Sequence, residues 1–528
     1  MQAKYIKYKD TGYFSKLITD YLDGDSALDE FIGYDNNLDG YKRIISERNT
    51  VAVDRDLLVD RLTVQNKGIE LSELSRSNIN TLKTKDTFSI TTGHQLSFFT
   101  GPLYFIYKTA SIIKLAIELK EKFPENNFVP VFWMASEDHD FEEINHFRCY
   151  NELISWNTSE KGAVGRMKPE NIDDALSQFQ EALGEGGKRA AYLLELFKRS
   201  YSEQDNLAEA TRFLVNELFG EYGIVIIDGD DRELKKTMIP LFKKELNEFR
   251  SDRNLKATNA GLLLKGYKVQ VNQREINLFY LDNNLRERIV FENGKYKVLN
   301  TKIEFSKTEI IEELESNPER FSPNAILRPL YEEHVLPNIA YVGGGGELAY
   351  WFQLKSNFKD FGVSFPVLVL RNSLMLIKSG QQRRMKSLGL SVNEMFKGVD
   401  DLIRIKVLEN SDTDIDISEH LEAVNKIFYE LLKKYSSDQS LLPSIKAQHK
   451  KQIKGLYELE KKLLRAEKRK QSELVAKIEK LKSDLFPKNV LQERKVNFAE
   501  MYMEFGEDLI SGIMQNIIVL DNEFAVMH

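Results

Sequence analysis

The sequence has very little cysteine and no excess of positive charge. Cys149 is the only cysteine among 528 residues, so one chain can build neither a disulfide framework nor a cysteine-rich zinc site. The formal net charge is −7, which leaves no general basic field to hold a nucleic-acid backbone. We therefore expect a protein of the reducing cytoplasm that does not bind nucleic acid.

Long apolar runs and several familiar motifs are also absent. No run of roughly 18 apolar residues occurs, so no membrane-spanning helix is expected. Residues 1–7 lack the apolar stretch of a signal peptide. No repeat of about 20–50 residues is visible, which excludes a solenoid. Neither a Walker loop nor a G-x-G-x-x-G motif occurs. The sequence therefore does not favour the common folds that bind nucleoside triphosphates or NAD.

What the sequence does contain is a set of short, strongly apolar segments. They are residues 88–92, 128–135, 224–228, 339–343 and 367–371. Each is apolar on both faces, as expected for strands buried in a parallel sheet. Helix-like segments follow at least three of them, at 103–120, from Glu142 onward and at 347–355. This alternation predicts an α/β protein with a Rossmann-like, doubly wound parallel sheet. We predict that the strands ending at Thr92, Ala135 and Gly343 lie side by side.

Two insertions and a helical region complete the predicted organisation. Residues 147–220 begin with a hairpin-like segment. Residues 255–320 contain expected strands at 267–281 and 288–299, around the turns Asn283-Asn284 and Asn293-Gly294. Beyond Leu376 the sequence is highly charged, and its leucines follow 3-4 spacing with an interruption at 467–472. This pattern predicts a broken coiled coil that joins two chains into a homodimer; an ordinary amphipathic helix is the alternative.

The predicted domain boundaries follow these changes in residue pattern and charge. They are an N-terminal helical segment at 1–85, a core at 86–146, 221–254 and 321–378, a first insertion at 147–220, a second, β-rich insertion at 255–320, a coiled-coil domain at 379–490, and a C-terminal segment at 491–528 that returns to the core.

The first strand-to-helix junction carries Thr92, Gly93, His94 and Gln95, and Lys108 follows on the next helix. Ligands of open parallel sheets bind beyond the carboxyl ends of the strands, and helix N-termini offer free N–H groups to phosphates. A capped, glycine-containing turn is the structural alternative. The concentration of polar groups favours a binding role for all five residues.

The second junction carries Glu137, Asp138, His139 and Asp140 directly after a buried strand, followed by Asn145 and His146. Crowded carboxylates raise one another's pKa values and attract cations. The seven-residue spacing of the two histidines is not a recognised zinc pattern, so we expect acid–base chemistry or amine binding and no metal. A charged loop facing solvent is the alternative.

The third junction is rich in glycine and lies near an arginine. Its candidate binding residues are Arg328, Gly344, Gly346, Glu347 and Tyr350. Arg371 and Asn372, at the end of the fifth predicted strand, are two further candidates. Glycines allow a ligand to approach the backbone closely, and an arginine fork binds carboxylates or phosphates bidentately. Four of the seven histidines lie in the three junction segments, which favours one shared site.

Taken in order, these segments resemble the bacillithiol biosynthesis cysteine-adding enzyme (BshC) family. The resemblance rests on Thr92–Gln95, Glu137–Asp140, Arg328-Pro329 and Gly343–Glu347, and it extends over almost the whole chain. It implies a ligase that adds L-cysteine to glucosaminyl-malate in the last step of bacillithiol biosynthesis. It also implies a core similar to class I aminoacyl-tRNA synthetases, with connecting-peptide-like insertions, and a coiled-coil homodimer.

The synthetase analogy also implies activation by ATP, with ADP or AMP as product and Mg as the accompanying ion. Thr91–His94 stands where such enzymes place an H-x-G-H motif, and Arg384–Ser387 is a weak counterpart of their lysine-rich loop. Glu137, Asp138, His139 and Asp140 are the predicted catalytic residues. A nucleotidyltransferase acting on another small substrate, or an inactive coiled-coil scaffold, are the competing readings; a scaffold would have no use for the acidic junction.

Overall fold

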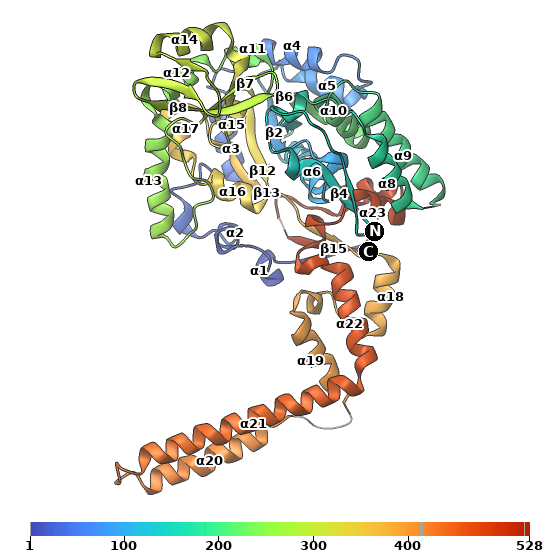
Figure 1. Cartoon of the computed structure of the whole chain (residues 1–528), viewed down its shortest axis with the longest axis vertical. Helices are drawn as coiled ribbons and strands as arrows, with labels where there is room; N and C mark the ends of the chain where they lie inside the picture. Colours follow the sequence, from blue (N-terminus) through green and yellow to red (C-terminus); the bar gives the residue numbers. More distant parts are fainter. Residues whose placement is uncertain (1, 185, 412–415, 522) are drawn as a thin grey trace. The chain divides into compact units, whose positions relative to one another are not determined.

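The computed structural model describes residues 2–184, 186–411, 416–521 and 523–528. The chain forms two compact units, Met1–Leu376 with Leu491–His528 and Ile377–Val490 (Figure 1). The first unit mixes strands and helices, whereas the described residues of the second contain helices only. The predicted combination of an α/β core with a helical C-terminal region is confirmed.

A five-stranded parallel sheet lies at the centre of the first unit, in the order β13-β12-β2-β3-β6. Its strands are β2 (Thr87–His94), β3 (Asn127–Met134), β6 (Val225–Asp228), β12 (Asn338–Gly343) and β13 (Val367–Leu370). β2 pairs in parallel with β3 on one side and with β12 on the other, which confirms the predicted neighbours. Every residue of β2, β12 and β13 is buried, because helices cover both faces of the sheet.

The winding direction of this sheet reverses between β2 and β12. The chain passes from β2 to β3 and β6 on one side, and then returns to place β12 and β13 on the other side of β2. In open α/β sheets, ligands bind in the crevice beyond the carboxyl ends of the strands at such a reversal. The topology therefore points to the residues that follow β2 and β12.

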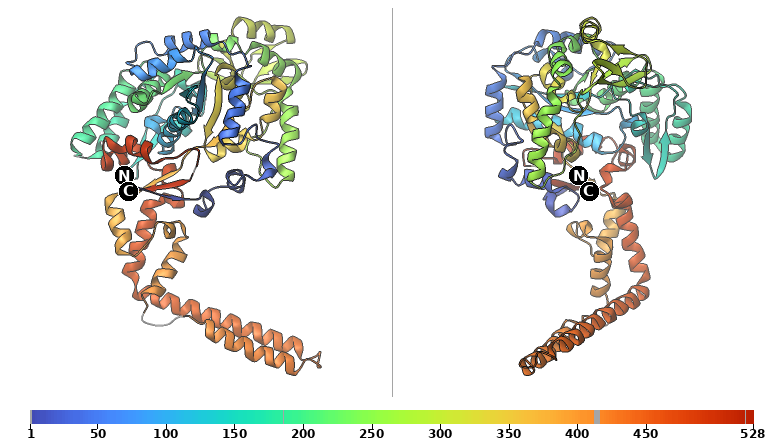
Figure 2. Two further views of the ribbon diagram at one scale, coloured as in Figure 1. Left: turned by 180° about the vertical axis from the view of Figure 1, so that it is seen from behind. Right: turned by 60° about the vertical axis from the view of Figure 1, so that its left-hand side comes forward.

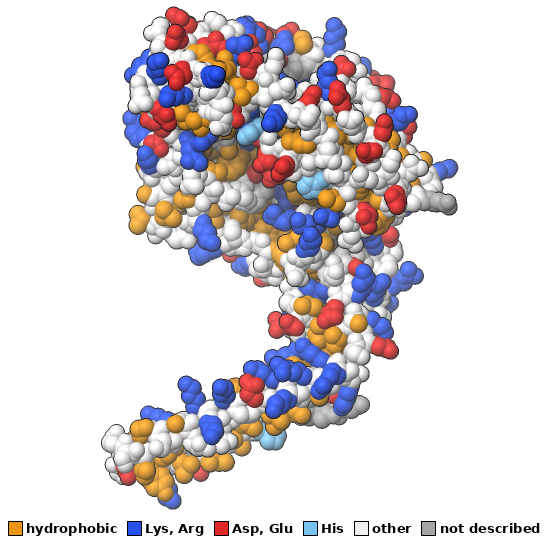
Figure 3. All heavy atoms as spheres, viewed as in Figure 1, with side chains coloured by type: hydrophobic (Ala, Val, Ile, Leu, Met, Phe, Trp, Pro, Cys, Tyr) orange, Lys and Arg blue, Asp and Glu red, His pale blue; other side chains and the backbone are white. Residues whose placement is uncertain are grey.

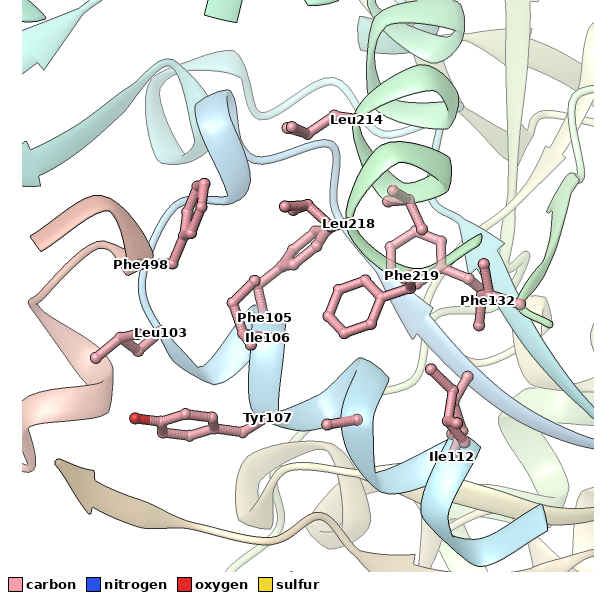
Figure 4. Packing of buried hydrophobic residues seen from close by; sticks show 14 of the residues in the cluster. Leu103, Phe105, Ile106, Tyr107, Ile112, Phe132, Leu214, Leu218, Phe219 and Phe498 are labelled. Carbon is pink, nitrogen blue, oxygen red and sulfur yellow. The ribbon is translucent and has the colours of Figure 1, made fainter. Parts of the chain in front are cut away.

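Helix α6 (Tyr104–Lys122) connects β2 to β3 and is apolar on most of its surface. Figure 4 shows its residues Phe105, Ile106 and Ile112 beside Phe132 of β3 and Phe219 of α10 (Leu207–Phe219). Phe498, at the start of α23 (Phe498–Phe505), packs into the same cluster. The core thus joins segments from the sheet, the first insertion and the C-terminal segment.

Helices and a small sheet complete the first unit. The helices of its N-terminal part are α1 (Tyr8–Thr11), α2 (Lys16–Leu22), α3 (Leu38–Arg48), α4 (Arg55–Gln65) and α5 (Glu73–Thr81), and those after the first insertion are α11 (Arg232–Lys236), α12 (Ile239–Glu248), α15 (Arg328–Val335), α16 (Gly345–Trp351), α17 (Lys355–Phe361) and α24 (Asp508–Asn516). The strand β15 (Phe524–Met527) pairs with β1 (Ala3–Ile6) and β14 (Leu374–Leu376), so both chain ends lie together (Figure 1). Strand β1 was not expected from the sequence, because only Ile6 of its four residues is buried.

The two insertions have the expected hairpins. The first contains β4 (His146–Cys149), β5 (Glu152–Ser155), α8 (Asp173–Leu183), α9 (Gly187–Ser202) and α10. The second contains most of α13 (Arg250–Leu264), followed by β7 (Leu278–Asp282), β8 (Leu285–Glu292), β9 (Lys295–Val298), β10 (Glu304–Phe305) and α14 (Lys307–Ser316). The strand β11 (Phe321–Pro323), which pairs with β7, follows directly after this insertion. Asn284, Asn293 and Gly294 all have positive φ, which confirms the two predicted turns.

Two expected elements are shorter than their sequence pattern indicates. Residues 267–281 were expected to form one strand, but the strand begins only at Leu278. The buried Glu245 carboxylate accepts hydrogen bonds from the backbone and side-chain nitrogens of Asn277, which take the place of strand pairing. The helix expected from Glu142 onward is a single turn, α7 (Phe141–Ile144), because the β4 hairpin begins at His146.

The second unit consists of helices α18 (Ser379–Ser387), α19 (Val399–Glu409), α20 (Ser418–Lys434), α21 (Leu442–Lys470) and α22 (Ser472–Leu485). Helices α20 and α21 lie side by side (Figure 2). The break between α21 and α22 falls at Gln471, within the predicted interruption. None of the described helices combines the length and apolar character that crossing a membrane requires.

Leucines on α21 remain exposed in the single chain. Leu459 and Leu463 are 48% and 38% exposed, which favours burial against a second copy. We expect Leu459→Glu with Leu463→Glu to convert a dimer into a folded monomer, measured by sedimentation velocity, whereas Lys450→Glu with Lys454→Glu on the same helix should remain dimeric. An unchanged dimer in the leucine variant would contradict this assignment.

Candidate active site

A cavity of about 680 Å³ opens beyond the carboxyl ends of β2 and β3 and beside the start of α16. Its floor includes Gly93, His94 and Glu347, and its opposite wall comes from the second insertion, including Phe279 and Arg286. Figure 3 shows acidic, basic and histidine side chains gathered on a hollowed face of the molecule. The cavity lies where the sheet reverses, as the topology requires.

An ion pair between the buried Lys108 and the partly exposed Glu347 joins the first and third junctions. Lys108 donates to Glu347 Oε1 at 2.6 Å and to the carbonyl of Gly93. Tyr341 donates to the same Oε1 at 2.9 Å, and the Gly344 amide donates to Oε2 at 2.8 Å. Burial raises the pKa of Glu347, but Lys108 and these bonds outweigh burial and hold that pKa below its usual value. Glu347 is therefore an ionised anchor rather than a proton carrier.

His94 is buried beside this pair and stays neutral. Its Nδ1 lies 2.8 Å from the backbone carbonyl of Gln95, so the proton sits on Nδ1 and Nε2 is an acceptor. Its ring packs against Tyr104 and Phe105. Burial and the charge of Lys108 lower the pKa of His94 to about 3. His94 can accept a hydrogen bond from a ligand but carries no charge near neutral pH.

Gly93 is required by the close approach of Arg328. A Cβ at this position would lie 2.8 Å from Arg328 Nη1. Arg328 donates to Glu332 at 2.5 Å and to the Tyr350 hydroxyl at 3.2 Å. The fully buried Glu332 was not singled out from the sequence, because it precedes no recognisable motif. Burial raises its pKa to about 7, although Arg328 opposes the shift.

The raised pKa of Glu332 predicts a pH-dependent stability. A carboxyl that binds its proton more tightly in the folded state stabilises the fold at low pH and loses that contribution as pH rises toward its folded pKa. Between pH 5 and 7 we expect the free energy of unfolding to fall by about 2 kcal/mol from this group. In urea unfolding, the fall between pH 5 and 7 should be about 2 kcal/mol smaller in Glu332→Gln than in wild type; an equal fall in both proteins would show that Glu332 is not responsible.

The second junction forms a hydrogen-bonded acidic edge. Gln95 Nε2 donates to Asp138 Oδ2 at 3.0 Å and to Glu143 Oε2 at 2.9 Å. Burial raises the pKa of Asp138, but hydrogen bonds from His139 and Gln95 and the charge of Arg286 hold it well below the usual range. Asp138 is therefore a permanent negative charge at the cavity wall.

Glu137 has the opposite electrostatic character. It is paired with Lys235, which is 0% exposed and also lies 3.3 Å from Asp230. Burial raises the pKa of the Glu137 carboxyl in spite of Lys235. Two adjacent carboxylates with opposite pKa shifts suit different roles in one reaction, one as an anchor and the other as a proton acceptor.

Arg286 reaches the same wall from the second insertion. Its Nη1 donates to His139 Nδ1 at 2.7 Å, and its guanidinium stacks on Phe279 with its carbon 3.9 Å from the ring centroid. His139 therefore holds its own proton on Nε2. Sequence reasoning missed both Arg286 and Lys235, since neither belongs to a motif and each reaches the site only through tertiary packing.

The structure brings only some of the predicted site residues to the cavity. Gly93, His94, Gln95, Lys108, Glu137, Asp138, Arg328, Glu347 and Tyr350 line it. Thr92, Asp140, Asn145, His146, Gly344, Gly346, Arg371 and Asn372 do not, and His139 contacts it through Arg286. Arg384–Ser387 lies in the helical unit.

Local contacts explain several of these placements. Thr92 donates to the carbonyl of Val342 within the sheet. Arg371 pairs with the buried Glu493 at 2.7 Å, and Asn372 donates to the carbonyl of Ile518. Both side chains thus bind the C-terminal segment. Across the described residues, no group of three or more His, Cys, Asp or Glu could hold a metal ion.

Solved structures resemble this chain only weakly. A tryptophanyl-tRNA synthetase from Encephalitozoon cuniculi matches with a TM-score of 0.20 and 11% identity, over 87% of this chain and 100% of that chain. Similarity at this level does not support an argument about activity or substrate.

Sequence relatives and family models give a much stronger result. Relatives named "Putative cysteine ligase BshC" are 48% identical in Flavobacterium psychrophilum, over 100% of this chain and 99% of the relative, and 45% identical in Flavobacterium johnsoniae, over 100% of both. The model of the bacillithiol biosynthesis BshC N-terminal Rossmann-like domain matches residues 1–372, and that of the C-terminal coiled-coil domain matches residues 374–528. The chain therefore belongs to the bacillithiol biosynthesis BshC family.

Proposed function

We propose that this protein is a ligase that joins the carboxyl group of L-cysteine to the amine of glucosaminyl-malate in the last step of bacillithiol biosynthesis. The observation that carries the proposal is the cavity at the sheet reversal, where the adjacent Glu137 and Asp138 have opposite pKa shifts. The name of the relatives, "Putative cysteine ligase BshC", supports cysteine as one of the substrates.

Asp138 is the proposed anchor for the ammonium group of cysteine. Its carboxylate stays ionised because of the bonds from Gln95 and His139. A fixed negative charge on a partly buried wall binds an ammonium group more strongly than it would in water. Asp138 would therefore orient the amino acid without taking a proton itself.

Glu137 is the proposed general base. The amine of the sugar acceptor must lose a proton when it attacks the activated carbonyl carbon of cysteine. A new C–N bond forms, the bond from that carbon to its activated oxygen breaks, and the amine proton passes to the Glu137 carboxylate. Its raised pKa suits this role, because a base works best when its pKa lies near the working pH.

His139 takes a different proposed role from the one its position in the sequence indicates. Arg286 occupies its Nδ1 at 2.7 Å, so Nε2 carries a proton and can donate it in a hydrogen bond. In this arrangement His139 would hold the Arg286 guanidinium in place at the cavity wall.

The second insertion offers a cation for the malyl group of the acceptor. Arg274 lines the cavity and is exposed, and no carboxylate among the described residues lies within ion-pair distance of it. An arginine fork matches the geometry of a carboxylate. Glucosaminyl-malate would thus lie with its malyl carboxylates at Arg274 and its amine toward Glu137.

A nucleoside triphosphate, with Mg, is the proposed source of activation. When bound, it would convert an oxygen of the cysteine carboxyl group into a leaving group. Lys108 and His94 line the same cavity, where they would offer a positive charge and a neutral hydrogen-bond acceptor.

Incubation with L-cysteine, glucosaminyl-malate and ATP tests this function. We expect mass spectrometry to detect the amide product, with AMP or ADP formed in equal amount. Omission of any one substrate should abolish the product. Formation of a nucleotide adduct of another small molecule, or no reaction of the folded protein with these three compounds, would contradict the proposal.

A further inference from the structure

A second, smaller cavity beside the main one is lined by cations. Its volume is about 130 Å³, and Gln95 and Tyr104 line both cavities. Arg148 of β4 and the consecutive residues Arg494 and Lys495 contribute positive charge to its wall. These cations come from parts of the chain that are far apart in sequence, so tertiary folding brings them together.

The C-terminal segment that carries two of these cations is firmly held. The backbone of Val496 accepts a hydrogen bond from the Leu103 amide at 2.8 Å. The buried Asn497 donates from its side chain to the carbonyls of Phe99 and Gly101 at 2.8 and 2.6 Å, and from its backbone to the carbonyl of Arg148 at 3.2 Å. These bonds fix Arg494 and Lys495 beside the N-terminus of α6.

Among the described residues, cations outnumber acids in the lining of this cavity. Glu143 is its only lining acid, and one of its oxygens accepts the bond from Gln95. Within the described residues, none of the three cations has a carboxylate at ion-pair distance; Arg148 makes only a 3.3 Å bond to the carbonyl of Asn151. Burial lowers the pKa of the neighbouring His146, and Arg148 and Lys495 lower it further, as expected for a positive field.

We infer that this smaller cavity binds the phosphate chain of the nucleoside triphosphate that activates cysteine, an inference that rests on the proposed function. Arginine forks bind phosphate oxygens bidentately, and the N-terminus of a helix such as α6 adds a favourable dipole. Gln95 and Tyr104 connect the phosphate position to the acidic wall of the main cavity. The core has no clear lysine-rich motif, so the C-terminal segment supplies these cations instead.

Inorganic pyrophosphate is the probe for this subsite. Calorimetry on the full chain should show binding that weakens with added salt and that falls about tenfold or more in Arg494→Ala with Lys495→Ala. Both side chains are exposed, so the fold should survive. Arg148→Met should weaken binding independently. Arg76→Ala with Lys85→Ala removes the same charge from exposed positions elsewhere and should bind like wild type.

Steady-state kinetics separate this inference from the proposed function. The Arg494/Lys495 variant should raise KM for ATP about tenfold while KM for cysteine stays unchanged. If the Arg494/Lys495 variant still makes the amide and its pyrophosphate binding and KM for ATP are unchanged, only this inference is overturned. Competition of pyrophosphate with glucosaminyl-malate instead of ATP would also overturn it, because the cavity would then hold malyl carboxylates. If the wild-type protein binds pyrophosphate but makes no amide, and the variant loses that binding, only the proposed function is overturned.

Discussion

Replacing Glu137 with glutamine is expected to reduce turnover by ~10²–10⁴-fold, because the amide cannot accept the proton that leaves the acceptor amine. The fold should persist, since Lys235 keeps Asp230 as a charged partner at 3.3 Å. The loss should appear in kcat, with KM for cysteine nearly unchanged, in a steady-state assay of amide formation.

Glu142→Gln is the matched control for this experiment. Glu142 lies five residues further along the same acidic segment and is exposed on α7, so its loss should leave turnover at the wild-type level. If Glu137→Gln unfolds at lower temperature yet keeps wild-type turnover when folded, Glu137 is structural and the assignment of the base is wrong.

Asp138→Asn is expected to act mainly on cysteine binding. The amide keeps the shape of the side chain but removes the charge that would hold the ammonium group, so KM for cysteine should rise about tenfold or more. KM for glucosaminyl-malate should change little. An equal rise for both substrates would indicate a general distortion of the wall instead of a cysteine anchor.

The second large effect concerns stability. Lys108→Met should destabilise the protein by about 1–3 kcal/mol, because it removes the buried cation that pairs with Glu347, whose side chain is itself 30% exposed. Lys108 is 2% exposed, so water cannot replace the ammonium group. Urea unfolding followed by circular dichroism measures the change.

The double variant Lys108→Met with Glu347→Gln identifies the cause of that loss. Removing both charges should cost less than removing Lys108 alone, since no unpaired charge is then buried. If the two variants are equally destabilised, the loss comes from packing around the lysine stem and not from the ion pair.

The parallel sheet could be predicted because each strand has a recognisable apolar pattern within a short segment of sequence. Residues 128–135 and 339–343 are apolar at every position, which in a short segment indicates burial on both faces. The turns at Asn284 and Gly294 could be predicted for the same reason, since a positive φ favours those residue types. The helical C-terminal region could be predicted in the same way, from its high charge and the 3-4 spacing of its leucines.

The remaining site residues depend on contacts that leave no local pattern. Arg371 ends a buried strand, as a ligand-binding residue would, but its partner Glu493 lies in the C-terminal segment. Lys235 and Arg286 reach the acidic wall from separate elements. A spacing rule compares residues on one element, so it detects neither a distant ion pair nor a cation supplied by an insertion.

The most direct measurement is a crystal structure of the protein with the product bacillithiol. The account predicts that the product occupies the cavity at the sheet reversal, with its cysteinyl ammonium group at Asp138, its amide nitrogen near Glu137 and its malyl carboxylates toward Arg274. Product bound at another position, with this cavity unchanged, would contradict the central claim that the reaction takes place here.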